Sequence, residues 1–591
     1  MKIKTITIHN FRCFEDVTFR ARDYALLVGA NNVGKSNFID ALRIFYEKDL
    51  KYEDARDFPK FPTKDQESWM DFTFQLTDDE YADLKAEYRL PGNTLMVRRY
   101  MKTTERDNAN KIRSGVFGYT ETGIANEHFY GARNVQDGKL GEVIYIPDVS
   151  VLSDHTKMSG PSALRDLISD ILKKLVKKSP SFQKLTSEFG SFSTTLKTEQ
   201  TDDKHSLEGL EADVNAAIEE WGTEFELVIN PLSENDLVKN LVSFRIREEA
   251  LGDRLEATQF GQGFQRHLIY TFIRLAARYQ EAPAKGRKKD FTPALTLLLF
   301  EEPEAFLHPQ QVSNLSGDLM ELSRQVDHQV ICSTHSPAFV SPNSDDIAAI
   351  ARLERIGGRT TIGQIPDTEL ATLFIDNQCL NDLFVKAGGH VMPEDTTEDM
   401  EAVKYFLWLN NERCAAFFAR RVLLVEGPTE RVFINHLIRT GHCIVPEGGV
   451  FALDCLGKYN IHRFMNLFRR LNIRHAVLYD GDGDKPIDRA VRDAIEHCKN
   501  DFTLGIHELP GTLERFLGIT PARDQHRKPQ HLMLEYLQGR IGPDRVKAFV
   551  DVVEGLLPDT ASTPAPGGSI ASEEAPDGGE AVPASDGDTT P

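Results

Sequence analysis

Apolar and polar positions alternate in two different rhythms along the first part of the chain. Up to about residue 150, short apolar runs separated by polar connectors indicate β-strands. These runs are IKTITIHNF, DVTFRA, YALLVGA, WMDFTFQL, TLMVRRYM and EVIYIP. From about Ser162 to Trp221, apolar residues recur at helical spacing, most clearly in LRDLISDILKKLVKK. The pattern therefore predicts a sheet-containing region interrupted by a helical insertion at about residues 160–222.

The rest of the chain continues the alternation of strands and helices. Strand and helix patterns run through about Leu383, and a helical connector follows from about Glu398 to Ala419. A second strand-helix-strand pattern then extends to about Leu557. Such alternation is typical of α/β folds with parallel sheets. Because 591 residues exceed what one hydrophobic core supports, we expect an α/β protein of several domains.

The composition is that of a soluble globular protein, with 40% hydrophobic and 27% charged residues. No apolar run is long enough to cross a bilayer, and the first residues, MKIKTITIHNF, lack the pattern of a secretory signal. The seven cysteines are scattered without a C-x-x-C pair, which favours reduced thiols over disulfides or structural zinc. We therefore expect a cytoplasmic protein that makes no membrane contact.

The net charge of −21 is distributed unevenly. Residues 558–591 are poor in large apolar side chains and are predicted to be a disordered acidic tail. This tail contains seven acidic and no basic residues, which is a third of the net charge. A surface for nucleic acid would therefore have to be a local basic patch formed by the fold. The densest basic run, between Lys173 and Lys178, is typical of a solvated helix face.

A glycine-rich segment, GANNVGKS, joins the apolar strand YALLVG to the helix NFIDALRIFYE. Gly29 and Gly34 allow the backbone to bend around a phosphate, and N–H groups of the loop and helix N-terminus face the anion. Lys35 would neutralise the terminal phosphates, and Ser36 would offer its hydroxyl to Mg²⁺. The alternative is a glycine turn with a solvated lysine. The predicted nucleotide site consists of Gly29, Asn31, Asn32, Gly34, Lys35, Ser36 and Asn37.

A later strand adds carboxylates of the kind that a nucleotide site needs. Residues Leu295 to Phe300 form a nearly continuous apolar run, as expected for a parallel strand covered on both faces. Because ligands bind at the carboxyl ends of such strands, Glu301 is predicted to hold the Mg²⁺ shell and Glu302 to position the attacking water. Alternatively, both glutamates open the following helix. The next apolar strand, QVICSTHSP, carries His335 past its end, where a lone histidine is otherwise structural.

A second cluster of acids lies in the last third of the chain. These acids are Glu426 and Glu430 in RRVLLVEGPTE, and Asp480 and Asp482 in IRHAVLYDGDGD. In both segments an apolar strand ends at the first acid, and a glycine permits a tight turn before the next. Acids that converge at strand ends repel one another unless a cation neutralises them, which predicts bound Mg²⁺ or Mn²⁺. A solvated acidic turn is the alternative for DGDGD, whereas a calcium loop is disfavoured because the glutamate that ends an EF-hand is missing.

The order of the first group of motifs resembles the ATP-binding cassette superfamily, in particular its SMC-like and RecF-like branch. IKTITIHNFRCFEDVTF, the Walker A segment from Gly29 to Ser36, the Walker B segment from Leu297 to Glu302, the D-loop-like EAFLHP and the switch-like His335 follow in that order. The resemblance implies that His335 senses the γ-phosphate. The signature segment, from Phe260 to Gln265, matches only in part, because Gln262 stands between its two glycines.

In this superfamily the signature segment caps ATP that is bound by a second subunit. Gln262 and Gly263 are therefore carried over as ATP contacts, and dimer-dependent hydrolysis is implied. The apolar stripe of the helical insertion could pair with a partner helix, and packing on its own domain is the alternative.

The acidic segments resemble the Toprim domain of topoisomerases, bacterial primases and several nucleases, in which one strand ends in Glu and a later strand in Asp-x-Asp. Here these residues are Glu426, Asp480 and Asp482, and the family uses such acids with divalent metal to make or break phosphodiester bonds. Glu514 in LPGTLERFL and Lys528 in RKPQHLMLEYL resemble later nuclease elements. The resemblance implies that Glu514 is a metal ligand and that Lys528 stabilises the charged transition state. A surface helix charge is an equal or better interpretation of each.

An SMC-like ATPase followed in one chain by Toprim resembles the overcoming-lysogenization-defect (OLD) nuclease family, which includes the nuclease subunit of Gabija antiphage systems. The resemblance covers residues 1 to about 557. It implies an ABC-type P-loop ATPase domain with the helical insertion at 1–385, a helical connector at 386–419 and a Toprim α/β domain at 420–557. It further implies an ATP-regulated, divalent-metal-dependent DNA endonuclease or nickase in antiphage defence, with ATP and Mg²⁺ or Mn²⁺ as cofactors.

The partners implied by the resemblance are DNA, further copies of the chain in a homodimer or homotetramer, and a partner helicase. The second hypothesis is an SMC-like DNA-repair ATPase whose Toprim domain serves binding rather than cleavage, although intact Glu426, Asp480 and Asp482 argue against it. A topoisomerase would need a nucleophilic tyrosine on a separate DNA-binding module, which is not recognisable. A primase would bring a zinc-binding segment, which the cysteine spacing does not provide.

Overall fold

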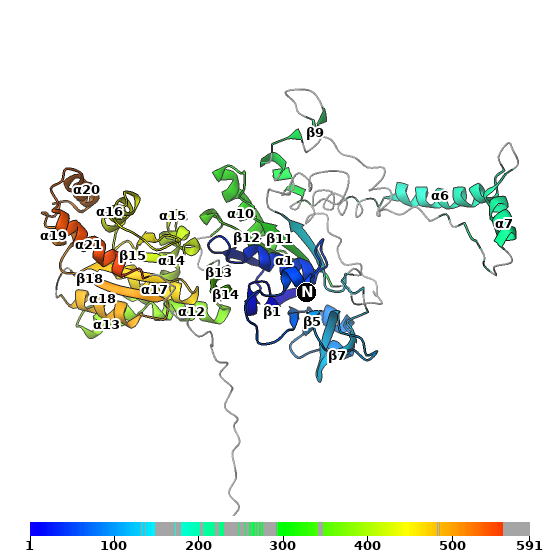
Figure 1. Cartoon of the computed structure of the whole chain (residues 1–591), viewed down its shortest axis with the longest axis horizontal. Coiled ribbons are helices and arrows are strands. Elements are labelled where there is room, and N and C mark those ends of the chain that lie inside the picture. The colour runs from blue at the N-terminus through cyan, green and yellow to red at the C-terminus, as the bar shows by residue number, and fades with distance from the viewer. Residues whose placement is uncertain are drawn as a thin grey trace, which may run out of the picture.

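Two bodies lie side by side in the computed structural model, an N-terminal one coloured blue to green and a C-terminal one coloured yellow to red (Figure 1). The structure describes residues 1–558 except for 132, 136–137, 148–171, 173–175, 177–178, 201–204, 219–222, 224, 228, 230–245, 248–253, 256–258, 262, 266, 269–270, 273–274, 276–290, 292, 341–346, 482 and 484. The predicted acidic tail beyond residue 558 therefore lies outside the described residues. Within them, no helix combines the length and apolar character needed to span a membrane.

A six-stranded, mostly parallel sheet forms the centre of the N-terminal domain, in the order β14-β13-β3-β12-β11-β8. Strand β14 pairs with β13 in the antiparallel direction, and the other pairs are parallel. Because β3, β12 and β11 are neighbours, the segments that follow these three strands meet at one edge of the sheet. The strands are β3 (Tyr24–Val28), β8 (Glu142–Ile146), β11 (Thr296–Glu301), β12 (His328–Ser333), β13 (Ile350–Ile356) and β14 (Arg359–Gln364).

A second, antiparallel sheet in the order β2-β1-β4-β5-β6-β7 packs over helix α1 (Lys35–Phe45). One core cluster joins Phe72 of this sheet, Phe38 of α1, and Leu27 and Leu299 of the parallel sheet. Helix α1 is thus packed between two sheets, which fixes the glycine-rich loop at its N-terminus. The strands are β1 (Lys2–Phe11), β2 (Phe14–Arg20), β4 (Ser68–Gln75), β5 (Thr94–Lys102), β6 (Gly115–Thr120) and β7 (Gly123–His128). The strands predicted from IKTITIHNF to EVIYIP are confirmed.

Helix α10 (Pro309–Ser323) covers the other face of the parallel sheet. Its Leu315 and Leu319 share a buried cluster with Leu298 of β11 and Val330 of β12. This packing holds β11 and β12 from the face opposite α1. The remaining short elements are α2 (Asp54–Asp57), α3 (Asp78–Asp83), η1 (Ala86–Tyr88), β9 (Ile246–Arg247), β10 (Arg254–Leu255) and η5 (Pro337–Phe339).

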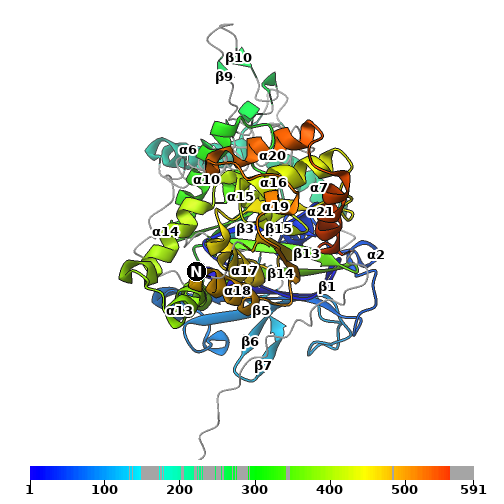
Figure 2. The same cartoon turned by 90° about the vertical axis from the view of Figure 1, so that its left-hand side faces the viewer.

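The C-terminal domain contains a four-stranded parallel sheet in the order β16-β15-β17-β18. Helices α16, α20 and α21 lie above this sheet in Figure 2, and α17 and α18 lie below it. The strands are β15 (Val422–Val425), β16 (Phe451–Asp454), β17 (His475–Asp480) and β18 (Thr503–Leu509). The helices are α16 (Pro428–Arg439), η8 (Lys458–Asn460), α17 (Ile461–Arg470), α18 (Pro486–His497), α19 (Leu513–Phe516), η9 (Gln525–Arg527), α20 (Lys528–Leu537) and α21 (Pro543–Gly555).

The helices between the two sheets pack against the C-terminal domain. Helix α13 runs against α18, and α12 contacts α17. The buried Glu401 of α14 receives two hydrogen bonds of 2.9 Å from Arg463 of α17. These elements are α12 (Asp367–Asp376), α13 (Cys379–Lys386), η6 (Pro393–Thr396), α14 (Glu398–Trp408), α15 (Asn411–Cys414) and η7 (Ala415–Phe418). The boundaries predicted at 385 and 419 stay predictions, although α12 and α13 already contact C-terminal helices.

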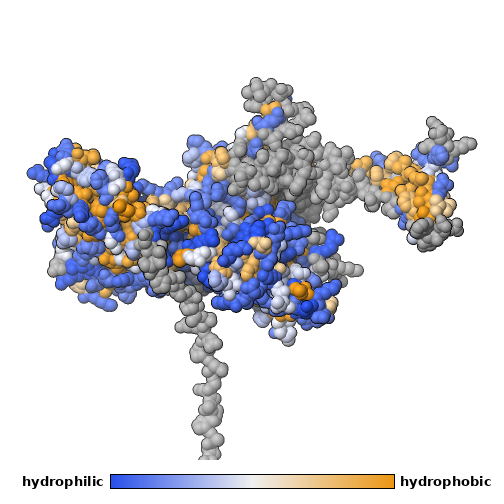
Figure 3. Space-filling view, viewed as in Figure 1, coloured by the Kyte–Doolittle hydropathy of each residue, from blue (hydrophilic) through white to orange (hydrophobic). Residues whose placement is uncertain are grey.

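Helices α6 (Pro180–Thr198) and α7 (Leu207–Ile218) lie within the predicted insertion and project away from the N-terminal domain (Figure 1). Neither helix has a buried residue. Leu185, Phe192 and Leu196 of α6 and Leu210 of α7 are all exposed, and an apolar surface is visible on this projection in Figure 3. Much of the predicted insertion before residue 180 and after residue 218 lies outside the described residues.

Candidate functional site

The glycine-rich loop has a backbone that only glycine fits at two positions. Gly29 has φ +137°, and a Cβ there would lie 2.4 Å from the carbonyl oxygen of Leu353. Gly34 has φ +109°, and a Cβ there would lie 2.7 Å from the Sγ of Cys13. Both values lie in the region that L-residues rarely adopt. Glycine is therefore required at both positions of the predicted loop, by the backbone conformation and by close packing against two neighbouring segments.

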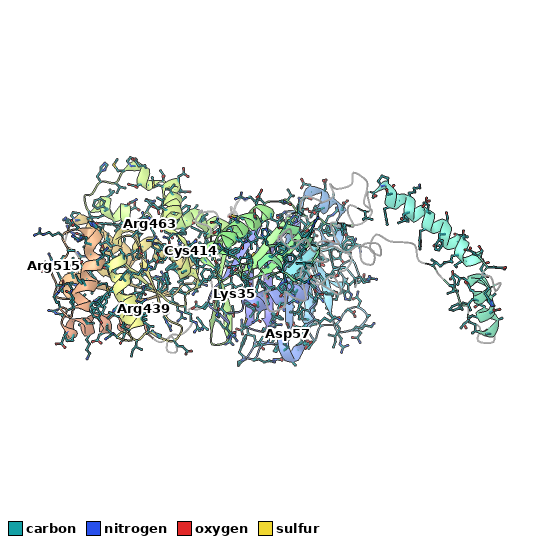
Figure 4. The ribbon with its side chains drawn as sticks, turned by 90° about the horizontal axis from the view of Figure 1, so that it is seen from above. Lys35, Asp57, Cys414, Arg439, Arg463 and Arg515 are labelled. Carbon is teal, nitrogen blue, oxygen red and sulfur yellow. The ribbon has the colours of Figure 1, made fainter. Side chains whose placement is uncertain are left out.

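Lys35 begins α1 directly after the loop and is only 6% exposed. Its Nζ donates to the carbonyl oxygens of Gly29 and Ala30, each at 3.0 Å, and burial lowers its pKa to about 8. The neighbouring Ser36 is exposed, and no side chain caps the helix N-terminus. Open N–H groups at a helix start, with an ammonium beside them, fit the phosphates of a nucleotide. Figure 4 shows Lys35 within the N-terminal domain.

The three asparagines of the predicted nucleotide site differ in their surroundings. Asn31 and Asn32 are exposed on the loop. Asn37 accepts a hydrogen bond from Arg12 at 3.0 Å, and its amide donates to the Sγ of Cys13 at 3.2 Å. Asn37 therefore ties α1 to the segment between β1 and β2, whereas Asn31 and Asn32 face the solvent side of the loop.

Glu301 and Glu302 stand at the end of β11, as predicted. Glu301 is buried and accepts a hydrogen bond from the hydroxyl of Tyr145 at 3.2 Å. Glu302 has a positive φ of 42°, which turns the chain at the strand end. The Nε2 of His335, which follows β12, lies 3.6 Å from Glu302 Oε1. The structure thus brings Glu302 and His335 together beside Lys35, and the Glu302 charge partly offsets the lowering of the Lys35 pKa by burial.

Glu304 is a further residue of this site that the sequence did not single out. Its Oε1 accepts a hydrogen bond from the backbone N–H of His335 at 2.6 Å, and burial raises its pKa. Burial lowers the pKa of His335, and the nearby Lys35 acts in the same direction. Glu304 therefore fixes the loop that carries His335. It stands within EEPEAF, but only the two acids at the strand end had a predicted role.

The signature-like segment lies against the D-loop-like segment of the same chain. A Cβ at Gly263 would lie 2.8 Å from the carbonyl oxygen of Phe306. Phe306 belongs to EAFLHP and has a positive φ of 62°. Gln262 lies outside the described residues, so its predicted contact with ATP stays a prediction.

The acids of the C-terminal domain meet at one edge of its parallel sheet. Strands β15 and β17 pair with Val425 opposite Leu478, so Glu426 and Asp480 follow the same end of adjacent strands. Asp480 is buried, and Glu426 is half-buried. Asp482 lies outside the described residues. The predicted convergence of Glu426 and Asp480 thus follows directly from the strand register.

Glu430 and Glu514 add two buried carboxyl groups near this edge. The Oε2 of Glu430 accepts a hydrogen bond from the Gly427 N–H at 3.0 Å, which caps α16. Burial, together with the charges of Glu426 and Glu514, raises the pKa of Glu430 to about 7. Glu514 is 1% exposed, and its Oε1 has no hydrogen-bond partner among the described residues. Neither residue is a solvated helix charge, the alternative that the sequence left open for Glu514.

The arrangement of these acids does not by itself form a closed metal cage. In the described part of the chain, no three His, Cys, Asp or Glu side chains are placed so that they could hold a metal ion. Lys528 begins α20, which packs against α16, the helix that carries Glu430. The ligand roles predicted for Glu426, Glu430, Asp480 and Glu514 and the role of Lys528 therefore stay predictions.

Asp454 is a further acid at this sheet edge, and it was not predicted. It ends β16, opposite Val425 of β15. Arg413 Nη2 lies 2.7 Å from its Oδ1, and Arg431 Nη1 lies 3.1 Å from its Oδ2. Two guanidinium groups therefore already neutralise this carboxylate. In the sequence, Asp454 is a lone acid after the short apolar run FAL, which is no motif. The two arginines that contact it lie on other elements and are not adjacent in the sequence.

The β13–β14 hairpin contacts the glycine-rich loop. The carbonyl oxygen of Leu353 lies where a Cβ on Gly29 would point. The hydroxyl of Thr360 donates to the carbonyl oxygen of Val33 at 2.8 Å. A movement of the loop would therefore act on this hairpin directly.

The same hairpin also contacts the C-terminal domain. Arg352, which is 2% exposed, donates to the carbonyl oxygens of Asn472 at 2.6 Å and Ala419 at 3.0 Å. Glu354 lies 3.4 Å from Arg352 and 3.5 Å from Arg474. Asn472 and Arg474 directly precede β17, the strand that ends at Asp480. The hairpin therefore links the two candidate sites through buried contacts.

Comparison with known proteins supports both halves of this description. Residues 1–112 and 100–340 match the family described as AAA ATPase domain, and residues 417–482 match the overcoming lysogenization defect protein-like TOPRIM domain. The Old nuclease of Escherichia phage P2 is 24% identical to this chain in an alignment that covers 82% of this chain and 77% of the nuclease. The OLD nuclease of Thermus scotoductus is 22% identical, covering 93% and 98%. Endonuclease GajA of Bacillus cereus is 23% identical, covering 82% and 75%.

The matches confirm the predicted fold, in which an ATPase domain is followed by a Toprim domain. The ATPase family covers more than half of the chain, and the three relatives extend across both domains. The chain therefore belongs to the AAA ATPase domain family, and it joins this domain to an OLD-like Toprim domain.

Proposed function

We propose that this protein is an ATP-regulated, divalent-metal-dependent DNA endonuclease or nickase. The observation that carries the proposal is the meeting of Glu426 and Asp480 at the carboxyl ends of adjacent parallel strands, with Glu430 and Glu514 buried nearby. The names of the three relatives, two OLD nucleases and one endonuclease, point to the same chemistry. The family resemblance adds antiphage defence in the cytoplasm to the proposal.

A divalent cation fits the chemistry of these residues. Carboxylate oxygens are the ligands that Mg²⁺ and Mn²⁺ prefer, and Glu514 holds a buried Oε1 without a described partner. We assign the ligands to Glu426, Glu430, Asp480, Asp482 and Glu514. When bound, the metal would supply an activated water and stabilise the leaving oxygen of a phosphodiester. The acids of the chain would position the metal, and Lys528 on α20 would stabilise the charged transition state.

ATP and Mg²⁺ fit the site in the N-terminal domain. Lys35 and the open start of α1 would receive the phosphates, and Ser36 with the buried Glu301 would hold the Mg²⁺. Glu302 would orient the attacking water, while Glu304 keeps His335 next to it. Burial and the nearby Lys35 lower the pKa of His335, and its imidazole N–H would donate a hydrogen bond to the γ-phosphate.

ATP would govern the Toprim domain through the β13–β14 hairpin. One side of the hairpin contacts the loop at Gly29 and Val33, and the other side holds the chain before β17 through Arg352. Coupling between two sites needs an element that both contact. The hairpin is such an element. The segment that it contacts before β17 lies only a few residues from Asp480, the last residue of β17.

A second copy of the chain is the proposed partner of the projecting helices. The apolar residues Leu185, Phe192 and Leu196 recur along α6 at helical spacing and are exposed. Exposed apolar stripes of this kind mark contact surfaces. The family resemblance adds that the segment around Gly263 caps ATP on the other copy. A homotetramer and a helicase partner remain part of the proposal from the family resemblance alone.

Cleavage of supercoiled plasmid tests the proposed function. The wild-type chain is incubated with EDTA, Mg²⁺ or Mn²⁺, each with and without ATP, and compared with Lys35→Ala. We expect nicked or linear DNA only with metal, and an ATP effect that Lys35→Ala loses because the phosphates lose their cation. Cleavage in EDTA, or no cleavage under any metal condition, would overturn the nuclease proposal. An ATP effect retained by Lys35→Ala would overturn the proposed regulation.

A further inference from the structure

Two cysteines, one on α13 and the other at the end of α18 in the C-terminal domain, lie in contact away from both candidate sites. The Sγ atoms of Cys379 and Cys498 are 3.7 Å apart, and all seven cysteines are free thiols. Cys379 is the first residue of α13, and Cys498 ends α18. Helix α13 packs along α18. The contact between the thiols is thus set by a helix pair, rather than by loops.

The pair is separated from the acidic sheet edge by the length of α18. That helix begins at Pro486, just beyond Asp480, and Cys498 stands at its opposite end. Twelve helical residues span about 18 Å. Chemistry at the two thiols therefore need not involve the acids proposed as metal ligands.

The two sulfurs have unequal surroundings. Cys379 is partly exposed, whereas Cys498 is 6% exposed. The hydrogen bond with Cys498 lowers the pKa of Cys379, and the Arg463 guanidinium acts in the same direction. The same hydrogen bond, together with burial, raises the pKa of Cys498. A partly exposed thiol with a lowered pKa beside a buried thiol is the arrangement in which the first reacts with an oxidant and the second resolves it.

We propose that Cys379 and Cys498 form a reversible disulfide when the protein meets a peroxide. The Cys379 thiolate attacks one peroxide oxygen, the O–O bond breaks, and the departing hydroxide takes up a proton to become water. The sulfenic acid left on Cys379 is then attacked by the Cys498 sulfur, which loses its proton. The S–O bond breaks, and the second hydroxide leaves with that proton as water. The two thiols lose two electrons, which reduce the peroxide, and a dithiol reverses the bond.

The disulfide would fasten α13 to the Toprim domain. Residues between Cys379 and Cys498 include β15, β16 and β17, so the bond closes a large loop around the strands that carry Glu426 and Asp480. Closing a long loop restricts the unfolded chain and stabilises the folded one. Movement of α13 relative to α18 would be lost as well. Oxidation therefore acts on the body that holds the acids without changing any acid.

Thiol counting on the full chain tests the proposal. Protein with reduced cysteines is treated with limiting hydrogen peroxide, alkylated under denaturing conditions and weighed by mass spectrometry. We expect two of the seven thiols to escape alkylation, a chain about 2 Da lighter before alkylation, and one cross-linked peptide pair containing residues 379 and 498. Dithiothreitol should restore all seven thiols. The thermal unfolding midpoint should rise by several degrees on oxidation.

Two variants and one control sharpen the test. In Cys498→Ser, dimedone should trap a sulfenic acid on Cys379, and the cross-linked peptide and the shift in unfolding midpoint should both vanish. Cys443→Ser, which removes a buried cysteine elsewhere in the domain, should still lose two thiols on oxidation. The proposal is overturned if the wild-type chain keeps all seven thiols, or if Cys379 proceeds to sulfinic acid without any cross-link to Cys498. None of these readouts depends on nuclease activity.

Discussion

Replacing Arg352 by Met should loosen the contact between the ATPase and Toprim domains. The guanidinium is 2% exposed and donates to the carbonyl oxygens of Asn472 and Ala419 at 2.6 and 3.0 Å. Methionine keeps most of the apolar stem and supplies no donor. Glu354 would still have Arg474 at 3.5 Å. The substitution therefore removes the hydrogen bonds between the domains while changing the packed volume little.

The expected cost follows from those contacts. A buried acceptor that loses its donor costs about 1–3 kcal/mol, and two carbonyl oxygens are affected. Removing one partner of a buried ion pair costs about 3–5 kcal/mol when the other charge is left unpaired. Here Glu354 keeps Arg474 as a partner, so this cost is smaller. We expect a total of about 3 kcal/mol. For domains of the size found here, this loss of free energy lowers the thermal unfolding midpoint by roughly 5–10 °C.

Two assays read out the Arg352→Met variant. Differential scanning calorimetry should show the lowered midpoint, and plasmid cleavage with and without ATP should show that the ATP effect is lost. ATP hydrolysis should stay within about twofold of wild type, because no P-loop contact is removed. As a matched control, Arg98→Met removes an arginine that pairs with Asp71 at 2.7 Å on the antiparallel sheet. That variant should be destabilised and keep the ATP effect.

The reasoning is refuted if Arg352→Met unfolds within about 1 °C of wild type and responds to ATP as wild type does. In that case the buried hydrogen bonds would carry neither the domain contact nor the coupling. If Arg98→Met also loses the ATP effect, the loss reflects general destabilisation rather than the hairpin.

Three further outcomes follow from single residues. Lys35→Ala should abolish binding of a fluorescent ATP analogue, and binding within about twofold of wild type would contradict its role. Glu401→Gln, which leaves the buried Arg463 without its carboxylate, should lower the free energy of unfolding by about 3–5 kcal/mol in urea titrations. Burial lowers the pKa of His475 to about 4, so only the unfolded chain gains a proton as pH falls from 6.5 to 4. The contribution of His475 to the free energy of unfolding is therefore complete above pH 6.5 and is lost as the pH falls from 6.5 to 4. In urea titrations, His475→Gln should lose less stability over this pH range than wild type, whereas His497→Gln should lose as much as wild type.

The parts of the fold that the sequence predicted are those decided by neighbouring residues. Strand β3 is an unbroken apolar run, and the loop after it needs glycine at positions 29 and 34 because both have positive φ. Strands β15 and β17 each end in an acid, and parallel pairing alone brings Glu426 and Asp480 to one edge. Local pattern and strand direction therefore sufficed to place these residues together.

The parts that were missed depend on partners distant in the chain. Glu304 matters because β12 brings the His335 backbone within 2.6 Å of it. Asp454 resembles a further metal ligand until Arg413 and Arg431 are seen to neutralise it. No local pattern records that α13 packs on α18. For Glu514 the sequence left a surface charge as an equal interpretation, and burial decides against it.

Plasmid nicking by isosteric variants of the Toprim acids tests the central proposal most directly. Glu426→Gln and Asp480→Asn keep the side-chain shape and remove the charge, and Glu496→Gln does the same at an exposed position of α18. With Mn²⁺ present, we predict that the first two lose nicking by about 100-fold or more while retaining ATP hydrolysis, and that Glu496→Gln nicks as wild type does. Wild-type nicking by Glu426→Gln or Asp480→Asn would contradict the assignment of the nuclease site.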